Sequence, residues 1–165
     1  MSRISRAVAA IVTLAVGCAS MNQPEPAASP KEKRVTSIGG VFFKAKDPEA
    51  LKRWYNAHLG LETDQWGTNF EWRQADHPDR KGFTQWSPHK TESKFFDKQF
   101  MINYRVENLD RLLEQLRAEG VTIVGKVQNE KYGKFAHIMD PEGNKIELWE
   151  PNDVEYEKIV EGRTK

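Results

Sequence analysis

Residues 140–151 read DPEGNKIELWEP, and no other block of the chain is as informative about its fold. The first five residues combine Asp, Pro, Gly and Asn, which favour the backbone conformations of a tight turn. Residues 145–150 are strand-like and are followed by Pro151, and residues 134–139 before the turn are strand-like too. The block therefore predicts a hairpin whose second strand ends at a proline.

Two helices are predicted about sixty residues apart. The first follows Asp47, an N-cap with proline at the next position, and ends at Gly60; the second follows Asn108 and ends at Gly120. Each carries apolar residues at helical spacing, and we expect these stripes to face the core. The stripes consist of Leu51, Trp54, Tyr55 and Leu59 in the first helix and Leu109, Leu112, Leu113 and Leu116 in the second.

Each helix lies between extended segments in the same order. One precedes the helix (38–46 or 100–106), and three follow it (61–66, 68–74 and 82–87, or 121–126, 134–139 and 145–150). Pro88 follows the first series as Pro151 follows the second. The sequence thus predicts an α+β domain of two βαβββ modules, which are internal repeats of nearly equal length. Two such modules side by side can curl their strands around a shared cup.

The quoted block, together with residues 43–47 (FKAKD), 54–55 (WY) and 59–61 (LGL), resembles the glyoxalase/bleomycin-resistance/dioxygenase family, the vicinal oxygen chelate (VOC) superfamily. The resemblance covers about residues 36–151. It implies the VOC fold of paired βαβββ modules with a helix behind each, and a ligand or metal site in the cup. Single-domain members often pair, so a homodimer is left open as a partner state.

Metal-using members carry one ligand on the first and last strand of each module. Counting from the helix caps and the closing prolines, these positions are Gly40, Thr84, Met101 and Glu147. Only Glu147 is a good ligand for a hard divalent ion, because glycine offers no donor and a thioether suits soft metals. The resemblance therefore implies a dismantled metal site and no cofactor, with a divalent metal not excluded.

Side chains alternate across a strand, so the residues that share the face of these positions can be counted. The expected cup contains aromatic, apolar and a few polar groups, as ligand pockets generally do. Glu147 either pairs with Arg105 or Lys44, or helps Arg105 and Asn103 to hold the polar edge of a ligand. The predicted ligand-binding residues are Phe42, Lys44, Thr84, Trp86, Met101, Asn103, Arg105, Glu147 and Trp149.

Glu147 and His137 are the candidate catalytic residues. If His137 faces the cup from its strand, the two side chains could act as general base and orienting partner. The connection 88–99 contains Phe95 and Phe96 among charged residues, and either folds over the cup as a lid or packs against a sheet edge.

Composition excludes several classes of protein. Twenty-five Lys and Arg against 24 Asp and Glu give a formal charge of +1, without the basic excess of a nucleic-acid-binding protein. A single cysteine excludes a disulfide framework and a Cys-rich zinc site.

The N-terminal residues predict export to the bacterial cell envelope. Arg3 and Arg6 precede the apolar run 7–16, which is too short to span a bilayer but fits a signal peptide over residues 1–17. Residues 14–18 (LAVGC) resemble a lipobox in which Cys18 is lipidated, although a plain secreted protein is the alternative. Residues 18–34, with three prolines, predict a flexible tether to a domain at 35–151. Residues 152–165 are expected to form a charged, solvated tail.

Three functions remain open at this point. The first is a small-molecule-binding protein without a metal, favoured by the aromatic, donor-poor cup. The second is a metal-dependent glyoxalase-like lyase or isomerase, or a ring-cleaving dioxygenase, favoured by Glu147. The third is an envelope interaction module with a vestigial cup.

Overall fold

The computed structural model describes residues 32–163. The signal peptide, Cys18 and most of the predicted tether therefore lie outside the described residues. Seven strands and three helices follow one another in this part of the chain: β1 (Ser37–Ala45), α1 (Pro48–Leu59), β2 (Thr68–Arg73), β3 (Lys81–Lys90), β4 (Phe100–Arg105), α2 (Leu109–Ala118), β5 (Ile123–Glu130), β6 (Gly133–Met139), β7 (Lys145–Pro151) and α3 (Asp153–Val160).

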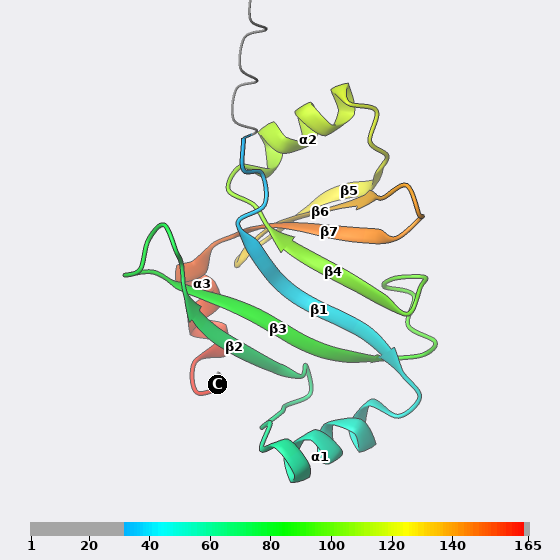
Figure 1. The fold of residues 1–165 in the computed structure, drawn as a ribbon, viewed down its shortest axis with the longest axis vertical. Helices are drawn as coiled ribbons and strands as arrows, with labels where there is room; N and C mark the ends of the chain where they lie inside the picture. Colours follow the sequence, from blue (N-terminus) through cyan, green and yellow to red (C-terminus); the bar gives the residue numbers. More distant parts are fainter. Residues whose placement is uncertain (1–31, 164–165) are drawn as a thin grey trace, which may run out of the picture. The chain divides into compact units, whose positions relative to one another are not determined.

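The strands form one curved sheet in the order β2-β3-β1-β4-β7-β6-β5 (Figure 1). Within each module the first strand pairs in parallel with the last, β1 with β3 and β4 with β7. The modules are joined by the antiparallel pair β1–β4, in which Gly40 faces Asn103 and Phe42 faces Met101. This symmetric pairing confirms the predicted α+β fold of two repeated modules.

Both predicted helix starts and one glycine stop are confirmed in detail. Asp47 and Asn108 are N-caps whose side chains accept hydrogen bonds from Ala50 N at 2.8 Å and Arg111 N at 3.0 Å. Gly60 ends α1 in the left-handed conformation at φ 64°, which glycine adopts without steric cost.

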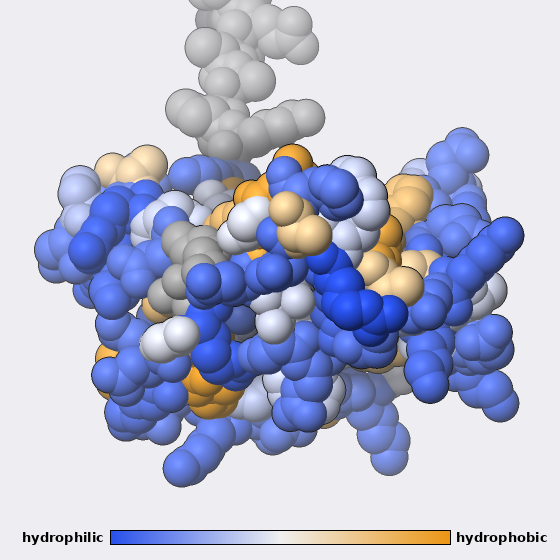
Figure 2. Space-filling model, turned by 90° about the horizontal axis from the view of Figure 1, so that it is seen from below, coloured by the Kyte–Doolittle hydropathy of each residue, from blue (hydrophilic) through white to orange (hydrophobic). Residues whose placement is uncertain are grey.

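The predicted core stripes differ in burial. In α2, Leu109, Leu112 and Leu113 are buried with Val106, Ala136 and Leu148 in one apolar cluster. In α1 the prediction is wrong for two residues, because Trp54 is 52% exposed and Leu59 is 65% exposed. Seen from the α1 end, the surface is largely hydrophilic and its apolar areas are small and separate (Figure 2).

Residues 61–66 do not form the predicted strand. Only an isolated bridge between Asp64 and Gly67 is present, and the Asp64 carboxylate accepts the Trp66 N–H at 2.7 Å. An aspartate that bonds to the backbone two residues later favours a turn over an extended strand. The first module therefore contributes three strands to the sheet and the second contributes four.

The C-terminal residues correct a further expectation. Instead of a solvated tail, residues 153–160 form α3, whose Tyr156 and Val160 are 7% and 1% exposed. They pack with Phe83 of the first module and Trp149 of the second. An ion pair between Arg163 and Asp64 holds the end of the helix to the 61–67 loop. The alternation of charged and apolar residues in this segment belongs to an amphipathic helix that spans both modules.

Among residues 32–163, no helix is long and apolar enough to cross a membrane.

Candidate functional site

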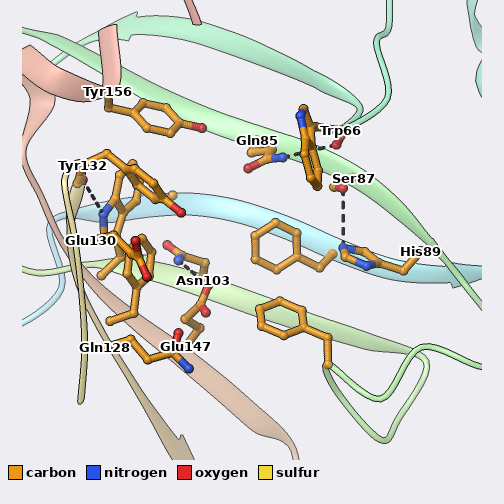
Figure 3. Close-up of a pocket in the computed structure, with 15 residues that line it drawn as sticks. Trp66, Gln85, Ser87, His89, Asn103, Gln128, Glu130, Tyr132, Glu147 and Tyr156 are labelled. Carbon is orange, nitrogen blue, oxygen red and sulfur yellow. Dashed lines mark hydrogen bonds between the residues drawn. The ribbon is translucent and has the colours of Figure 1, made fainter. Parts of the chain in front are cut away.

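A cavity of about 290 Å³ lies on the concave side of the sheet, between β1 and β3 of the first module and β4 to β7 of the second (Figure 3). Residue 66 before β2 and residue 156 on α3 complete its wall. The fifteen lining residues are Gly39, Phe42, Trp66, Gln85, Ser87, His89, Phe95, Asn103, Gln128, Glu130, Tyr132, Phe135, Glu147, Trp149 and Tyr156.

Glu147 is the buried acidic group of this cavity. Its side chain is almost fully buried, and it lies opposite Asn103 on β4 and opposite His137 on β6. Asn103 Nδ2 donates to Glu147 Oε2 at 2.8 Å, and His137 Nε2 lies 3.1 Å from Glu147 Oε1. Because a carboxylate only accepts, the histidine donates its Nε2–H. The neighbouring strands thus hold the carboxylate in one orientation.

The geometry settles the partner of Glu147. Neither of the predicted cations, Arg105 and Lys44, contacts it: Arg105 donates to both Asp153 oxygens at 2.6 and 2.7 Å, and Lys44 Nζ donates to the Asp97 carbonyl oxygen. His137 is Glu147's partner but does not line the cavity. A catalytic role for either residue stays a prediction.

Asn103 carries an unsatisfied acceptor beside Glu147. The residue is 2% exposed, and its Oδ1 has no hydrogen-bond partner in the described part of the chain. This oxygen lies over Gly39, where a Cβ atom would come within 2.3 Å of it. Gly39 is therefore needed for the close approach of β1 and β4 at this point. A buried acceptor without a donor is costly, and a ligand that donates a hydrogen bond could satisfy it.

Ser87 and His89 of β3 lie at the other end of the cavity (Figure 3). Ser87 Oγ and His89 Nε2 are 3.5 Å apart. The imidazole packs against Phe42, Phe95 and Phe96, and this burial lowers the pKa of His89 below its ordinary value. His89 is therefore neutral at physiological pH.

Aromatic rings form most of the remaining wall. Trp149 stacks on Phe135 with a centroid distance of 5.6 Å and donates its indole N–H to the Tyr132 carbonyl oxygen. Gly133 permits this packing, because a Cβ there would lie 2.4 Å from the Trp149 nitrogen, and its φ of 139° strains other residues. Tyr156 contacts Trp149 edge-on and donates to Asn69 Oδ1 at 2.9 Å.

Burial raises the pKa of Tyr156 to about 12, so its hydroxyl stays a donor at physiological pH.

Of the nine predicted ligand-binding residues, Phe42, Asn103, Glu147 and Trp149 line the cavity. Thr84 and Trp86 do not, and the prediction that they share its face is wrong. Trp86 packs against Tyr55 of α1, and the Thr84 hydroxyl donates to the Ile38 carbonyl oxygen.

Lys44, Met101 and Arg105 also lie outside the lining. Met101 is fully buried with Phe42 and Phe96, and Arg105 is separated from the cavity by Trp149, over whose ring its guanidinium lies at 5.1 Å.

The error on β3 has a definite origin. The sequence predicts that the strand ends at Pro88, but β3 continues to Lys90. Past Trp86, β1 is the one strand that pairs with β3 among residues 32–163, and this edge-like setting tolerates a proline. The ladder pairs Phe42 with Ser87 as it pairs Asn103 with Glu147, so Ser87 is the counterpart of Glu147. The helix caps lie 61 residues apart, and this offset from Glu147 leads to position 86, one residue short of Ser87.

Other lining residues were missed for different reasons. Tyr132 and Glu130 come from the β5–β6 hairpin, and Trp66 from a segment predicted to be a strand. Tyr156 was assigned to a tail. The amphipathic pattern of residues 153–160 was the available signal for that residue.

The 91–99 connection folds onto the concave face. Phe96 is 1% exposed and fills the space above Met101 and Phe42, while Phe95 lines the cavity beside His89. Lys145 donates to the Phe95 carbonyl oxygen at 2.8 Å and holds the loop to β7. The loop supplies part of the cavity wall through Phe95, and its action as a lid stays a prediction.

The residues present do not fit the metal site that the resemblance implies. Gly40 has no side chain, Met101 is enclosed by Phe42 and Phe96, and Ser87, at the position equivalent to Glu147, offers only a hydroxyl. Among residues 32–163, no group of three or more His, Cys, Asp and Glu side chains is placed to hold a metal ion.

The chain is similar to one protein family and to several solved structures. The profile of the Glyoxalase/Bleomycin resistance protein/Dioxygenase superfamily matches residues 37–148. No curated protein sequence matches the chain significantly.

Three solved structures illustrate the structural likeness. Methylmalonyl-CoA epimerase from Mycobacterium tuberculosis has 24% identity and a TM-score of 0.50, with 74% of this chain and 92% of that chain covered. A Streptomyces coelicolor methylmalonyl-CoA epimerase variant in complex with 2-nitronate-propionyl-CoA has 14% identity and a TM-score of 0.55, with 73% and 97% covered. The Mn(II)-bound glyoxalase from Novosphingobium aromaticivorans has 19% identity and a TM-score of 0.51, with 71% and 39% covered. At sequence identities this low, the structural similarity establishes the fold alone.

Proposed function

The chain belongs to the Glyoxalase/Bleomycin resistance protein/Dioxygenase superfamily, and we propose that it binds a small organic molecule in the cavity between its modules without a divalent metal. The observation that carries this proposal is the cavity itself. It combines aromatic walls with one oriented, buried carboxylate and an unsatisfied amide oxygen.

The composition of the cavity supports ligand binding. Ligand pockets are largely apolar and contain a few polar groups that fix the ligand's orientation. Here the apolar part is rigid, because Trp149 is held by stacking on Phe135 and by its hydrogen bond to Tyr132. A rigid wall loses little conformational freedom when a ligand binds.

The donor set supports binding without a metal. In the described residues, Met101 occupies its predicted ligand position as part of an apolar cluster with Phe42 and Phe96. Moving its side chain toward the cavity would break that packing. A metal centre would therefore need donors that this cup does not gather.

Elemental analysis tests the metal-free part of the proposal. The full chain and its Glu147→Gln variant are exposed to Zn, Ni, Fe, Mn and Cu, dialysed and analysed. We expect the same substoichiometric metal content in both proteins. Near-stoichiometric metal that is lost in Glu147→Gln would overturn metal independence and would make enzyme assays the next step.

A fragment screen tests ligand binding. Compounds balanced in charge are titrated into the full chain and followed by tryptophan fluorescence, because Trp149 and Trp66 line the cavity. Gln128→Trp places a large ring at the mouth of the cavity and should weaken the binding of hits. Lys126→Trp, on the same exposed strand but outside the lining, is the matched control. Absence of any hit, or equal binding by both variants, would contradict the proposal.

Proton-transfer catalysis is the second candidate function, and the Glu147–His137 pair favours it. Glu147 could take a proton from a bound substrate while His137 and Asn103 hold its carboxylate in place. Turnover of a carbon acid or a ring-cleavage substrate that is lost in Glu147→Gln, with ligand affinity retained, would establish this function. Metal-dependent turnover with the same loss would support the glyoxalase-like or dioxygenase alternative.

We also propose that the chain is exported and anchored in the cell envelope through a lipid on Cys18. The support is the sequence of residues 1–18 alone. Metabolic labelling with a fatty acid should modify the wild-type chain and leave Cys18→Ser unlabelled. A labelled Cys18→Ser variant, or an unlabelled wild type, would contradict the anchor.

A further inference from the structure

The charges that line the cavity have one sign. Glu130 and Glu147 are acidic, and the fifteen lining residues include neither lysine nor arginine. His89 is neutral because burial lowers its pKa. Two nearby cations bond to groups outside the lining or to its backbone: Arg105 Nη2 is paired with Asp153, and Lys145 donates to the Phe95 carbonyl oxygen.

The two carboxylates act on the same part of the cavity. The pKa of the Tyr132 phenol is raised by burial and by the negative charges of Glu130 and Glu147. Figure 3 shows Tyr132 and Glu130 on the wall near Glu147 and Asn103, away from His89. Both acidic side chains of the lining therefore lie at the end of the cavity formed by the second module.

The aromatic walls add to this preference. Seven rings line the cavity, from Phe42, Trp66, Phe95, Tyr132, Phe135, Trp149 and Tyr156. The face of an aromatic ring attracts a cation through its quadrupole, and the attraction grows when water is excluded. The same rings offer flat surfaces for stacking a planar group.

Acceptor positions that are still open lie on Asn103 and on Glu147 itself. In the described part of the chain, Asn103 Oδ1 is buried without a donor, and each Glu147 oxygen accepts one hydrogen bond although a carboxylate oxygen has two lone pairs. A ligand that donates hydrogen bonds at this point would satisfy these acceptors. An anionic or purely accepting ligand would leave these groups unsatisfied and would meet like charge.

We propose that the ligand of this cavity is a small planar organic cation, such as an aromatic amidine or amine, whose charged N–H groups donate to Glu147 and Asn103 while its ring lies among Trp149, Tyr132 and Tyr156. The inference rests on the proposed function, because it names the ligand class of the same cavity. A cavity of about 290 Å³ suits a molecule of one or two fused rings.

Three probes of nearly identical shape test the charge preference: benzamidine (cationic), benzamide (neutral) and benzoate (anionic). Each is titrated into the full chain by calorimetry or by protein-observed NMR. Benzamidine should bind roughly tenfold or more tightly than benzamide, because it adds charge-assisted hydrogen bonds and a cation–π contribution. Benzoate should bind most weakly.

Variants of the two acidic lining residues test whether the preference for a cationic probe arises in this cavity. Glu147→Gln should remove most of the difference in affinity between benzamidine and benzamide. Glu130→Gln should reduce the difference by a smaller factor. Glu130 is exposed, so this variant keeps the test valid if Glu147→Gln folds poorly. Glu114→Gln, an exposed residue of α2 outside the cavity, is the matched control.

The outcomes separate the two proposals. Equal affinities for the three probes, or tightest binding of benzoate, would overturn the cation preference and leave the cavity as a binding site for another ligand class. No binding by these probes or by any compound of the charge-balanced screen would overturn the proposed function as well. A benzamidine preference that survives both cavity variants would place the cation outside this cavity and overturn the inference.

Discussion

Both modules begin with a strand that leads into an N-capped helix, yet only the second module buries the apolar stripe of its helix. Leu109 and Leu113 of α2 are 0% and 1% exposed, whereas Trp54 and Leu59 of α1 lie largely in solvent. The strands behind the helices differ as well. The second module has four strands, while residues 61–66 of the first form a turn that Asp64 stabilises. The apolar side chains of a helix are buried only where the sheet behind the helix is wide enough to cover them.

The same difference is seen in the cavity. The second module contributes Asn103, Glu147, Glu130 and three of the seven aromatic side chains, and the first contributes Phe42, Ser87 and the neutral His89. Ser87 occupies the position equivalent to Glu147. One module thus supplies both the larger core and the charge of the site, and the repeat has diverged in both respects.

The largest effect should come from the helix cores. Leu113→Ala should lower the free energy of unfolding by about 2–5 kcal/mol, because it leaves a cavity in a closely packed cluster. Leu59→Ala, at the end of α1, should change it by no more than about 0.5 kcal/mol. Urea unfolding followed by circular dichroism measures both. Equal losses would mean that the α1 stripe is buried in solution and that the two helices are equivalent.

The link between the modules should have an intermediate effect. Tyr156→Phe removes the hydrogen bond to Asn69 and leaves a buried oxygen of the first module without a donor. The cost should be about 1–3 kcal/mol in unfolding free energy. Combining it with Asn69→Ser in a double-mutant cycle should reveal coupling, since the two side chains act as a pair. Strict additivity would show that α3 stabilises the modules independently of this bond.

Removal of either helix N-cap should lower the stability of the protein by a similar amount. Asp47→Ala and Asn108→Ala each remove one side-chain acceptor from an N-terminal N–H group. Each should cost about 1 kcal/mol, because capping depends on the first turn and hardly on burial of the helix. Thermal unfolding compares the two. If Asn108→Ala alone is destabilising, the first helix is already frayed in the native protein.

The smallest effect concerns pH and the first module's histidine. Burial lowers the pKa of His89 below its ordinary 6.5, so the unfolded chain binds a proton before the folded chain does as pH falls. The contribution of neutral His89 to stability is therefore complete above pH 6.5 and is lost as pH falls below it, by no more than about 1.4 kcal/mol per pH unit. Urea midpoints measured from about pH 7 to about pH 5 should decrease in the wild type.

His89→Gln should make that decrease smaller, and His58→Gln, an exposed residue of α1, should leave it unchanged. A wild-type slope that His89→Gln does not alter would assign the pH dependence to other groups.

The sequence by itself determined the repeat, the helix caps, the β6–β7 hairpin and the position of Glu147. These features depend on short-range chemistry: turn residues, caps and alternating apolar side chains act within a few residues of one another. For the same reason Phe42, Asn103 and Trp149 could be placed on the cavity wall from strand alternation. The failure at Thr84 and Trp86 came from Pro88, whose tolerance inside β3 depends on which strands lie beside it.

Only the tertiary structure decided what surrounds Glu147 and which stripes are buried. His137 becomes its partner because β6 pairs with β7 in one register, and Tyr156 reaches the cavity because α3 folds back across both modules. The loop with Phe96 encloses Met101 by contact between segments that no local pattern links. Burial, charge and ligand chemistry depend on which surfaces meet. Which distant segments come into contact depends on how much apolar area the whole chain can bury. Short sequence patterns do not encode this quantity.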